Sequence, residues 1–173
     1  MTTNSDADAG GDPALRMVSV AVPLLRVTVG VILLVTWFDN LDKDLYTGDG
    51  LSNFIEFLFA EDGNGSSLSA YQSVLDAIVV PAAGFFSRVQ LVVELAMALA
   101  LIFGFMTRLF SLVAAGFFAS LLLAYFGGEE WIWTYVLLLA SAVTVFLGAG
   151  GRRFGVDRLL VEARGRSPYG LLW

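Results

Sequence analysis

Four stretches of this chain are apolar over about the length that an α-helix needs to cross a bilayer. A crossing takes about 20 residues, and the stretches lie near residues 14–38, 85–106, 109–126 and 131–148. The composition agrees, because 57% of the 173 residues are hydrophobic, whereas about 45–50% is usual for a soluble domain. The sequence therefore predicts an all-α integral membrane protein, with a bundle of four transmembrane helices over residues 14–148.

The connection between the first two apolar stretches, residues 39–84, is too polar to cross the bilayer. Two of its segments, "LSNFIEFLFA" (residues 51–60) and "LSAYQSVLDAIVVP" (residues 68–81), repeat apolar residues at helical spacing around the turn-rich "EDGNGSS". This pattern predicts two short amphipathic helices at the membrane surface. The alternative is an unstructured acidic loop.

The two ends of the chain differ in charge. Residues 1–13 are polar and acidic, which predicts a disordered tail and lacks the positive start of a secretory signal peptide. Residues 149–173 form an arginine-rich tail, in which Val156, Leu159, Leu160 and Ala163 predict a short surface helix. Cytoplasmic segments carry an excess of basic residues. We therefore expect a multi-pass cell-membrane protein with both termini in the cytoplasm, given arginines at positions 16, 108, 152, 153, 158, 164 and 166.

Several kinds of chemistry are excluded because the chain has no cysteine and no histidine. Thiolate catalysis and disulfides are impossible, and the usual ligands of zinc, copper and haem are missing. We expect neither a metal site nor a covalent cofactor. The net charge of −6 argues against nucleic acid as a partner. Any redox chemistry must use a bound cofactor or a partner protein.

Two ionisable residues lie inside the predicted spans, where a charge is costly. Arg26 lies nine residues after Met17, and Glu94 lies twelve residues before Met106. If those methionines mark one membrane surface, the two depths differ by about one helical turn, at about 1.5 Å per residue. This predicts an Arg26–Glu94 ion pair, with Gln90 one turn before Glu94 as a further partner of the guanidinium.

The predicted pair has two interpretations. It either fixes the register of the first two helices or lines a polar pocket for a ligand head group or a proton. On the first helix Gly30, one turn after Arg26, would let the helices approach closely. On the cytoplasmic side we expect Asp157 to reach Arg108. The residues expected to be structural or partner-binding there are Arg108, Arg152, Arg153 and Asp157.

The order of several motifs resembles the DoxX/DoxD family of small four-helix membrane proteins. These motifs are "LLRVTVGVILL", "VELAMALALIFGFMTRL" and "GAGGRRFGVDRLL". The long first connection is similar to that of the DoxD type, the small subunit of thiosulfate:quinone oxidoreductase. The resemblance implies a membrane subunit associated with a quinone-linked oxidoreductase that oxidises a reduced sulfur compound. It also implies quinone as the ligand of a pocket formed by Arg26, Gln90 and Glu94.

Other functions remain open at this stage. The chain could instead be a non-catalytic scaffold or lipid-binding protein that anchors a partner at the inner membrane surface through Arg152, Arg153 and the surface helix. A small transporter is a third alternative, although four short helices enclose only a small lumen. In each case the expected partners are membrane lipid and either other subunits or further copies of this chain.

Overall fold

The computed structural model of the chain describes residues 13–148 and 154–165, and this part is all-α, as predicted. Residues 1–12 of the predicted tail, and Arg152 and Arg153, lie outside the described residues. The helices are α1 (Pro13–Asp42), α2 (Gly48–Phe59), α3 (Ser69–Val74), α4 (Ala83–Phe103), α5 (Thr107–Ala124), α6 (Trp133–Gly148) and α7 (Val156–Arg164).

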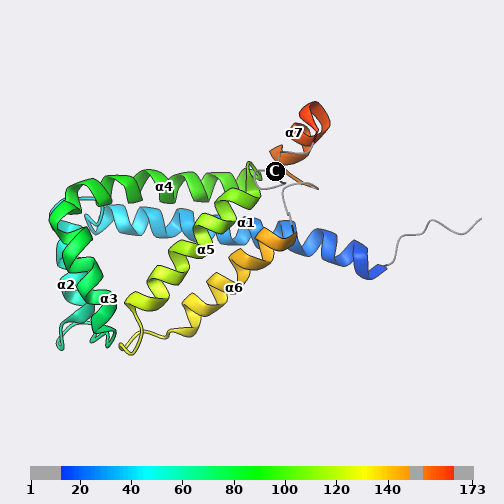
Figure 1. Cartoon of the computed structure of the whole chain (residues 1–173). Coiled ribbons are helices and arrows are strands. Elements are labelled where there is room, and N and C mark those ends of the chain that lie inside the picture. Colours follow the sequence, from blue (N-terminus) through cyan, green and yellow to red (C-terminus); the bar gives the residue numbers. More distant parts are fainter. Residues whose placement is uncertain (1–12, 149–153, 166–173) are drawn as a thin grey trace, which may run out of the picture.

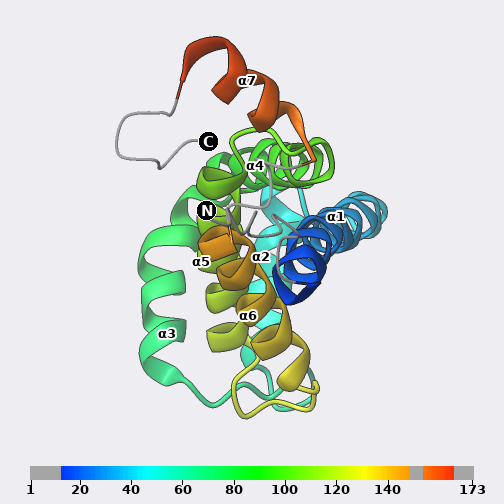
Figure 2. The same cartoon turned by 90° about the vertical axis from the view of Figure 1, so that its right-hand side faces the viewer.

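The helices form three pairs that enclose a triangle (Figure 1). Helices α1 and α4 lie side by side along one edge, and α5 and α6 pack together along an oblique edge. Helices α2 and α3 close the third edge, roughly across the direction of α1 (Figure 1). Figure 2 shows the same arrangement from the end, with α7 beyond the ends of α4 and α5.

A glycine lets α1 and α4 approach closely. A Cβ atom at Gly30 would lie 2.9 Å from the backbone nitrogen of Ile102 and 3.0 Å from the carbonyl oxygen of Ala98. This confirms the role predicted for Gly30. Nearer the other end of the interface, the Trp37 indole donates a hydrogen bond to the Leu91 carbonyl over 3.0 Å. These contacts fix the antiparallel register of the two helices.

Both amphipathic segments of the first connection are helical, so the alternative of an unstructured loop is wrong. The Thr47 hydroxyl caps α2 by accepting a hydrogen bond from the Gly50 amide over 3.0 Å, as N-cap residues commonly do. After α3 the chain passes through a π-helical turn, Leu75–Val79, and a 3₁₀ turn, Val80–Ala82. Pro81 lacks an amide hydrogen and so removes one helical hydrogen bond, and the chain turns there into α4.

The loops at the far corner of the triangle are hydrogen-bonded to each other. The Ser67 amide donates to the Phe126 carbonyl over 3.0 Å, and the Glu129 amide donates to the Asn64 carbonyl over 3.0 Å. The Asn64 side chain is buried in this contact. The α2–α3 loop therefore lies on the same side of the molecule as the α5–α6 loop.

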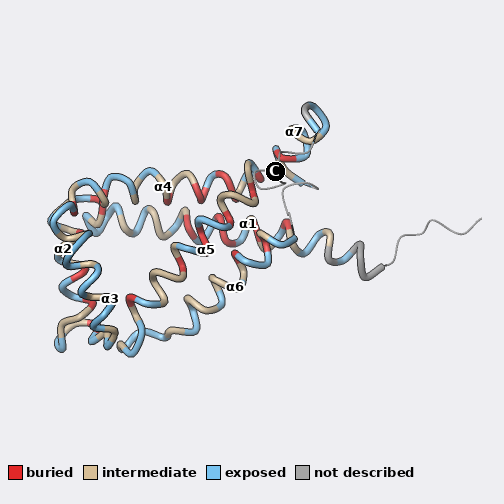
Figure 3. Tube along the Cα trace, viewed as in Figure 1, coloured by how far each residue is buried: buried red, intermediate tan, exposed pale blue. Residues whose placement is uncertain are grey.

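Within the described residues, three segments are long and apolar enough to cross a membrane: Ser19–Asp42, Ser69–Phe103 and Thr107–Ala124. The fourth predicted span, α6, is apolar but only 16 residues long. Buried positions face the inside of the bundle (Figure 3), whereas large apolar side chains are exposed on its outside. Continuous apolar exposure of this kind is typical of a surface that faces lipid or a partner. Examples on the four long helices are Val35, Val92, Leu112 and Leu147.

Candidate ligand site

The most buried ionisable group in the bundle is Glu94, near the middle of α4, with an exposure of 0%. The Tyr46 hydroxyl donates a hydrogen bond of 2.9 Å to its Oε2. The Asn40 amide lies 3.2 Å from Oε1 and 3.4 Å from Oε2. The Gln90 side chain, one turn earlier on α4, provides a further hydrogen bond. Three neutral side chains therefore hold this carboxylate.

The last turn of α1 and the loop after it position two of these donors. Asn40 lies on α1, three residues after Trp37, and Tyr46 lies in the loop before α2. Burial, reinforced by the charge of Glu94, raises the pKa of the Tyr46 phenol above its usual range. The phenol therefore stays protonated at ordinary pH and remains a hydrogen-bond donor. Sequence reasoning missed both residues, because nothing in their spacing links them to Glu94.

The predicted Arg26–Glu94 ion pair is wrong. Within residues 13–148 and 154–165, the polar contacts of Glu94 are with Tyr46, Asn40 and Gln90. Arg26 and Asn40 are fourteen residues apart on α1, which separates them by about 21 Å at about 1.5 Å per residue. Arg26 lies at the other end of the α1–α4 interface, where its guanidinium packs against Gly104 and interacts with the charge of Asp157.

Arg26 and Glu94 do not meet because α1 begins outside the bundle. The first part of α1 projects beyond the ends of α4 and α6 (Figure 1), so Met17 and Met106 do not lie at one level. Arg26, which is 3% exposed, instead lies level with Gly104 at the end of α4. The depth of Arg26 within the bundle was therefore overestimated. Gln90 and Glu94 lie together, but Gln90 bonds the Glu94 carboxylate and not the Arg26 guanidinium, so the partner predicted for Gln90 is wrong as well.

Asp157 of α7 reaches the α4–α5 turn, but its partners are not the predicted one. Its carboxylate accepts hydrogen bonds from the amides of Met106, over 2.6 Å, and Thr107, over 2.9 Å. Its own amide donates to the Gly104 carbonyl over 2.8 Å. The Arg108 guanidinium lies over the Phe146 ring, 4.9 Å from its centroid. Asp157 is therefore a cap for α5, and the predicted contact with Arg108 is wrong.

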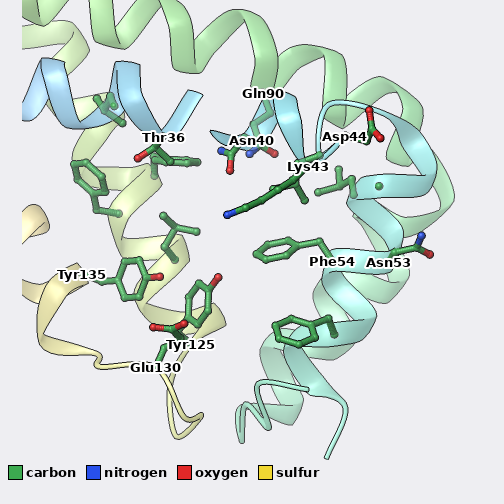
Figure 4. A pocket seen from close by; sticks show the side chains of 18 of the residues that line it. Thr36, Asn40, Lys43, Asp44, Asn53, Phe54, Gln90, Tyr125, Glu130 and Tyr135 are labelled. Atoms are coloured by element: carbon green, nitrogen blue, oxygen red, sulfur yellow. The ribbon is translucent and has the colours of Figure 1, made fainter. Parts of the chain in front are cut away.

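Two cavities flank the Glu94 site. Cavity A, of about 1170 Å³, lies between α1, α2, α5 and α6, and Asn40 and Gln90 are part of its lining (Figure 4). Cavity B, of about 320 Å³, lies between α2, α3, α4 and α5, and Glu94 and Gln90 are part of its lining. Apart from these two residues, cavity B is mainly apolar, with Tyr71 and Ser120 as further polar groups. Its volume is within the range of small-molecule sites, about 300–1,000 Å³.

Comparison with known proteins identifies the family. A family model described as the TQO small subunit DoxD matches residues 21–167. The chain belongs to the DoxD family. Neither a curated protein nor a solved structure matches it. The match covers all the described helices from the first third of α1 to α7, and together with the long apolar helices it makes the chain a membrane protein of an oxidoreductase-subunit family.

Proposed function

We propose that this chain is the membrane subunit of a quinone-linked oxidoreductase and that it binds the quinone head group in cavity B. The observation that carries the proposal is the Glu94 carboxylate. It is completely buried, borders an apolar cavity, and is held by Tyr46, Asn40 and Gln90 with no cation among its contacts in the described part of the chain. Polar groups placed at the wall of an apolar cavity are typical of small-molecule sites.

The groups at cavity B suit a quinone. The Gln90 amide would donate a hydrogen bond to a ring carbonyl, and the Glu94 carboxylate would accept one from a hydroxyl of the reduced form. The apolar lining, from Ile55 and Val93 among others, would exclude water and contact the ring and the start of its tail. When bound, the quinone supplies the two-electron redox chemistry, and the carboxylate is placed to take up or return a proton.

The electrons would come from a partner subunit. The chain has no cysteine and no histidine, so it lacks the usual ligands of haem and iron–sulfur groups. The family name refers to a small subunit, which supports partner chains and supports thiosulfate, or another reduced sulfur compound, as the electron donor of the whole complex.

The membrane arrangement that goes with this proposal is a four-helix bundle in the cell membrane. Helices α1, α4 and α5 would cross, and α6 would be the fourth span. The arginines near the ends of α4 and α6 support a cytoplasmic location for both termini. Helices α2 and α3, which run across the direction of α1 in Figure 1, would then lie near the outer surface.

Binding of decylubiquinone, measured by isothermal titration calorimetry in neutral detergent, tests the proposal. We expect Glu94→Gln to weaken binding by about tenfold, because it removes a charge-assisted hydrogen bond. Glu56→Gln, the same change at an exposed position of α2, should bind as the unmodified protein does. Thermal unfolding of both variants would show that they fold. Equal binding by the two variants, or no binding by the unmodified protein, would contradict the proposal.

A second candidate function is a scaffold that anchors a partner protein at the cytoplasmic surface. It is favoured by the outer side of α7 and the residues before it, where Phe154 is 58% exposed and Leu159 is 62% exposed. Truncation after Gly148 would not isolate this function, because it would also remove Asp157 from the α5 cap. Leu159→Asp, a substitution on the exposed side of α7, is the cleaner test.

A further inference from the structure

Cavity A changes from apolar to polar along its length. Along α1 and the turn after it, the lining begins with Ile32 and Leu33 and ends with Asn40 and Lys43. The wall formed by α6 and the preceding loop has the same gradient, from Leu138 through Tyr135 to Glu130. Because these residues follow one another along the helices, one end of the cavity is apolar and the other end is polar.

Hydrogen-bond donors converge at the polar end. Figure 4 shows the Lys43 side chain extended into the cavity, with the hydroxyls of Tyr125 and Tyr135 directed into the same space from the opposite wall. The two tyrosine rings are stacked, with centroids 4.8 Å apart, and this contact fixes their positions. Lys43 is the only lysine in the sequence. Tyr125 and Tyr135 also share a hydrogen bond, which uses one phenol hydrogen, so the arrangement presents one cation and one phenol donor to a ligand that accepts hydrogen bonds.

Carboxylates also occur around this end and limit the charge of the ligand. Asp44 and Glu130 both belong to the lining of the cavity, and Glu130 lies beside Tyr125 (Figure 4). Asp49, in the first turn of α2, is exposed. These groups would repel an anion of high charge. A head group with a single negative charge near Lys43 is more compatible with them.

We propose that cavity A binds a membrane phospholipid, with its phosphate at Lys43 and the start of an acyl chain against the apolar end. The singly charged phosphodiester matches the lysine ammonium and accepts a hydrogen bond from the phenol whose hydrogen is not used between Tyr125 and Tyr135. The volume of about 1170 Å³ is larger than the roughly 1,000 Å³ at the upper end of ordinary small-molecule sites, which leaves space for part of a chain. Cavities A and B share Gln90 and part of their apolar walls, but Lys43 lines cavity A alone, so the lipid proposal does not depend on a quinone in cavity B.

Lys43 offers a direct spectroscopic test. Reductive methylation with ¹³C-formaldehyde labels only Lys43 and the terminal amine, and it keeps the positive charge of the lysine. The probe is palmitoyl lysophosphatidylglycerol, titrated into the purified protein in neutral detergent. Monopalmitoylglycerol, which has the same chain without the phosphate, is the control ligand. We expect a saturable shift of the Lys43 methyl resonance with the first ligand and none with the second.

Calorimetry with the same two ligands tests the contribution of the charge. Lys43→Gln should weaken binding of the lysophospholipid by about tenfold, the usual effect of losing one charge-assisted contact, whereas Lys43→Arg should retain most of it. Arg88→Gln is the matched control, because Arg88 is an exposed cation that does not line cavity A. Thermal unfolding of each variant checks that it folds.

Three results would overturn the proposal. They are the absence of a saturable Lys43 shift, equal affinity for the charged and neutral ligands, and competitive displacement of the lysophospholipid by decylubiquinone. The last result would assign cavity A to quinone. Lys43→Gln should leave decylubiquinone binding unchanged, because Lys43 lines cavity A and not cavity B, so failure of the lipid proposal is distinguishable from failure of the quinone proposal.

Discussion

The Asp157 side chain connects three segments that are distant in sequence: α7, the α4–α5 turn and α1. Met106, whose amide it binds, has a φ of 46°, in the left-handed region that non-glycine residues rarely adopt. Such a conformation costs about 1–3 kcal/mol and persists when its surroundings hold it. Gly104 has a φ of 70°, and a side chain there would collide with the Arg26 guanidinium. The turn therefore depends on both the carboxylate and the glycine.

We expect Asp157→Ala to destabilise the bundle by about 2–4 kcal/mol. The substitution removes the cap of α5, worth about 0.5–2 kcal/mol, and it removes an anion from beside the buried Arg26, which adds to the loss. Thermal unfolding in detergent, followed by circular dichroism, measures the effect. Glu162→Ala is the control on the same helix. Its ion pair with Arg158, over 2.8 Å, is exposed, and such pairs contribute about 0–1 kcal/mol. Similar decreases in unfolding temperature for Asp157→Ala and Glu162→Ala would refute the role predicted for Asp157.

The sequence shows which charged residues lie in apolar helices, where burial costs free energy, but it does not show which residues they contact. Charged residues inside a predicted span need polar or charged partners, and Arg26 and Glu94 are both buried beside such groups. Their partners depend on where each helix begins relative to the bundle, and the apolar pattern of α1 does not show that its first turns project beyond α4. Asn40 and Tyr46 were missed for the same reason. They meet Glu94 only because the chain turns back after α1.

Helix α7 has an inner side that binds the α4–α5 turn and an outer side that is exposed. Asp157 points inward and is 1% exposed, whereas Leu159 is 62% exposed. Apolar surface of this kind on an otherwise charged helix suits a membrane surface or a partner protein. The two sides can therefore be tested separately.

Leu159→Asp should leave the unfolding temperature of the bundle nearly unchanged, because the side chain contributes little to the core. If α7 anchors a partner, the complex extracted from native membranes in mild detergent should become smaller on native gel electrophoresis. Arg158→Ala, at an exposed neighbouring position, should leave the complex intact. A complex of unchanged size with Leu159→Asp would argue against the scaffold function and in favour of the Glu94 site as the functional centre.

The helices themselves were largely predictable, because apolar periodicity depends on local sequence. The segments around 51–60 and 68–81 were expected to be helical, and α2, α3 and the π-helical turn occupy them. The triangular arrangement was not predictable. It depends on the turn at Pro81 and on hydrogen bonds between the loops near Asn64 and Phe126, which join residues about sixty positions apart and leave no periodic signal.

The triangle as a whole places the α2–α3 and α5–α6 loops at one corner and α7 near the opposite ends of α4 and α5 (Figure 1). Whether this gives four crossings depends on α6. Its 16 residues extend about 24 Å at about 1.5 Å per residue, compared with a hydrocarbon layer of about 30 Å. A short span can be accommodated by local thinning of the bilayer at a modest cost. We therefore expect α6 to cross.

Because the chain has no cysteine, single cysteines can report this topology without background. Asp62, Glu129 and Glu162 are exposed acidic residues in the α2–α3 loop, the α5–α6 loop and α7. In intact cells a membrane-impermeant maleimide should label Asp62→Cys and Glu129→Cys, and it should label Glu162→Cys only after permeabilisation. Labelling of Glu162→Cys from the same side as Glu129→Cys would show that α6 does not cross, because only α6 and the segment after it separate these two positions.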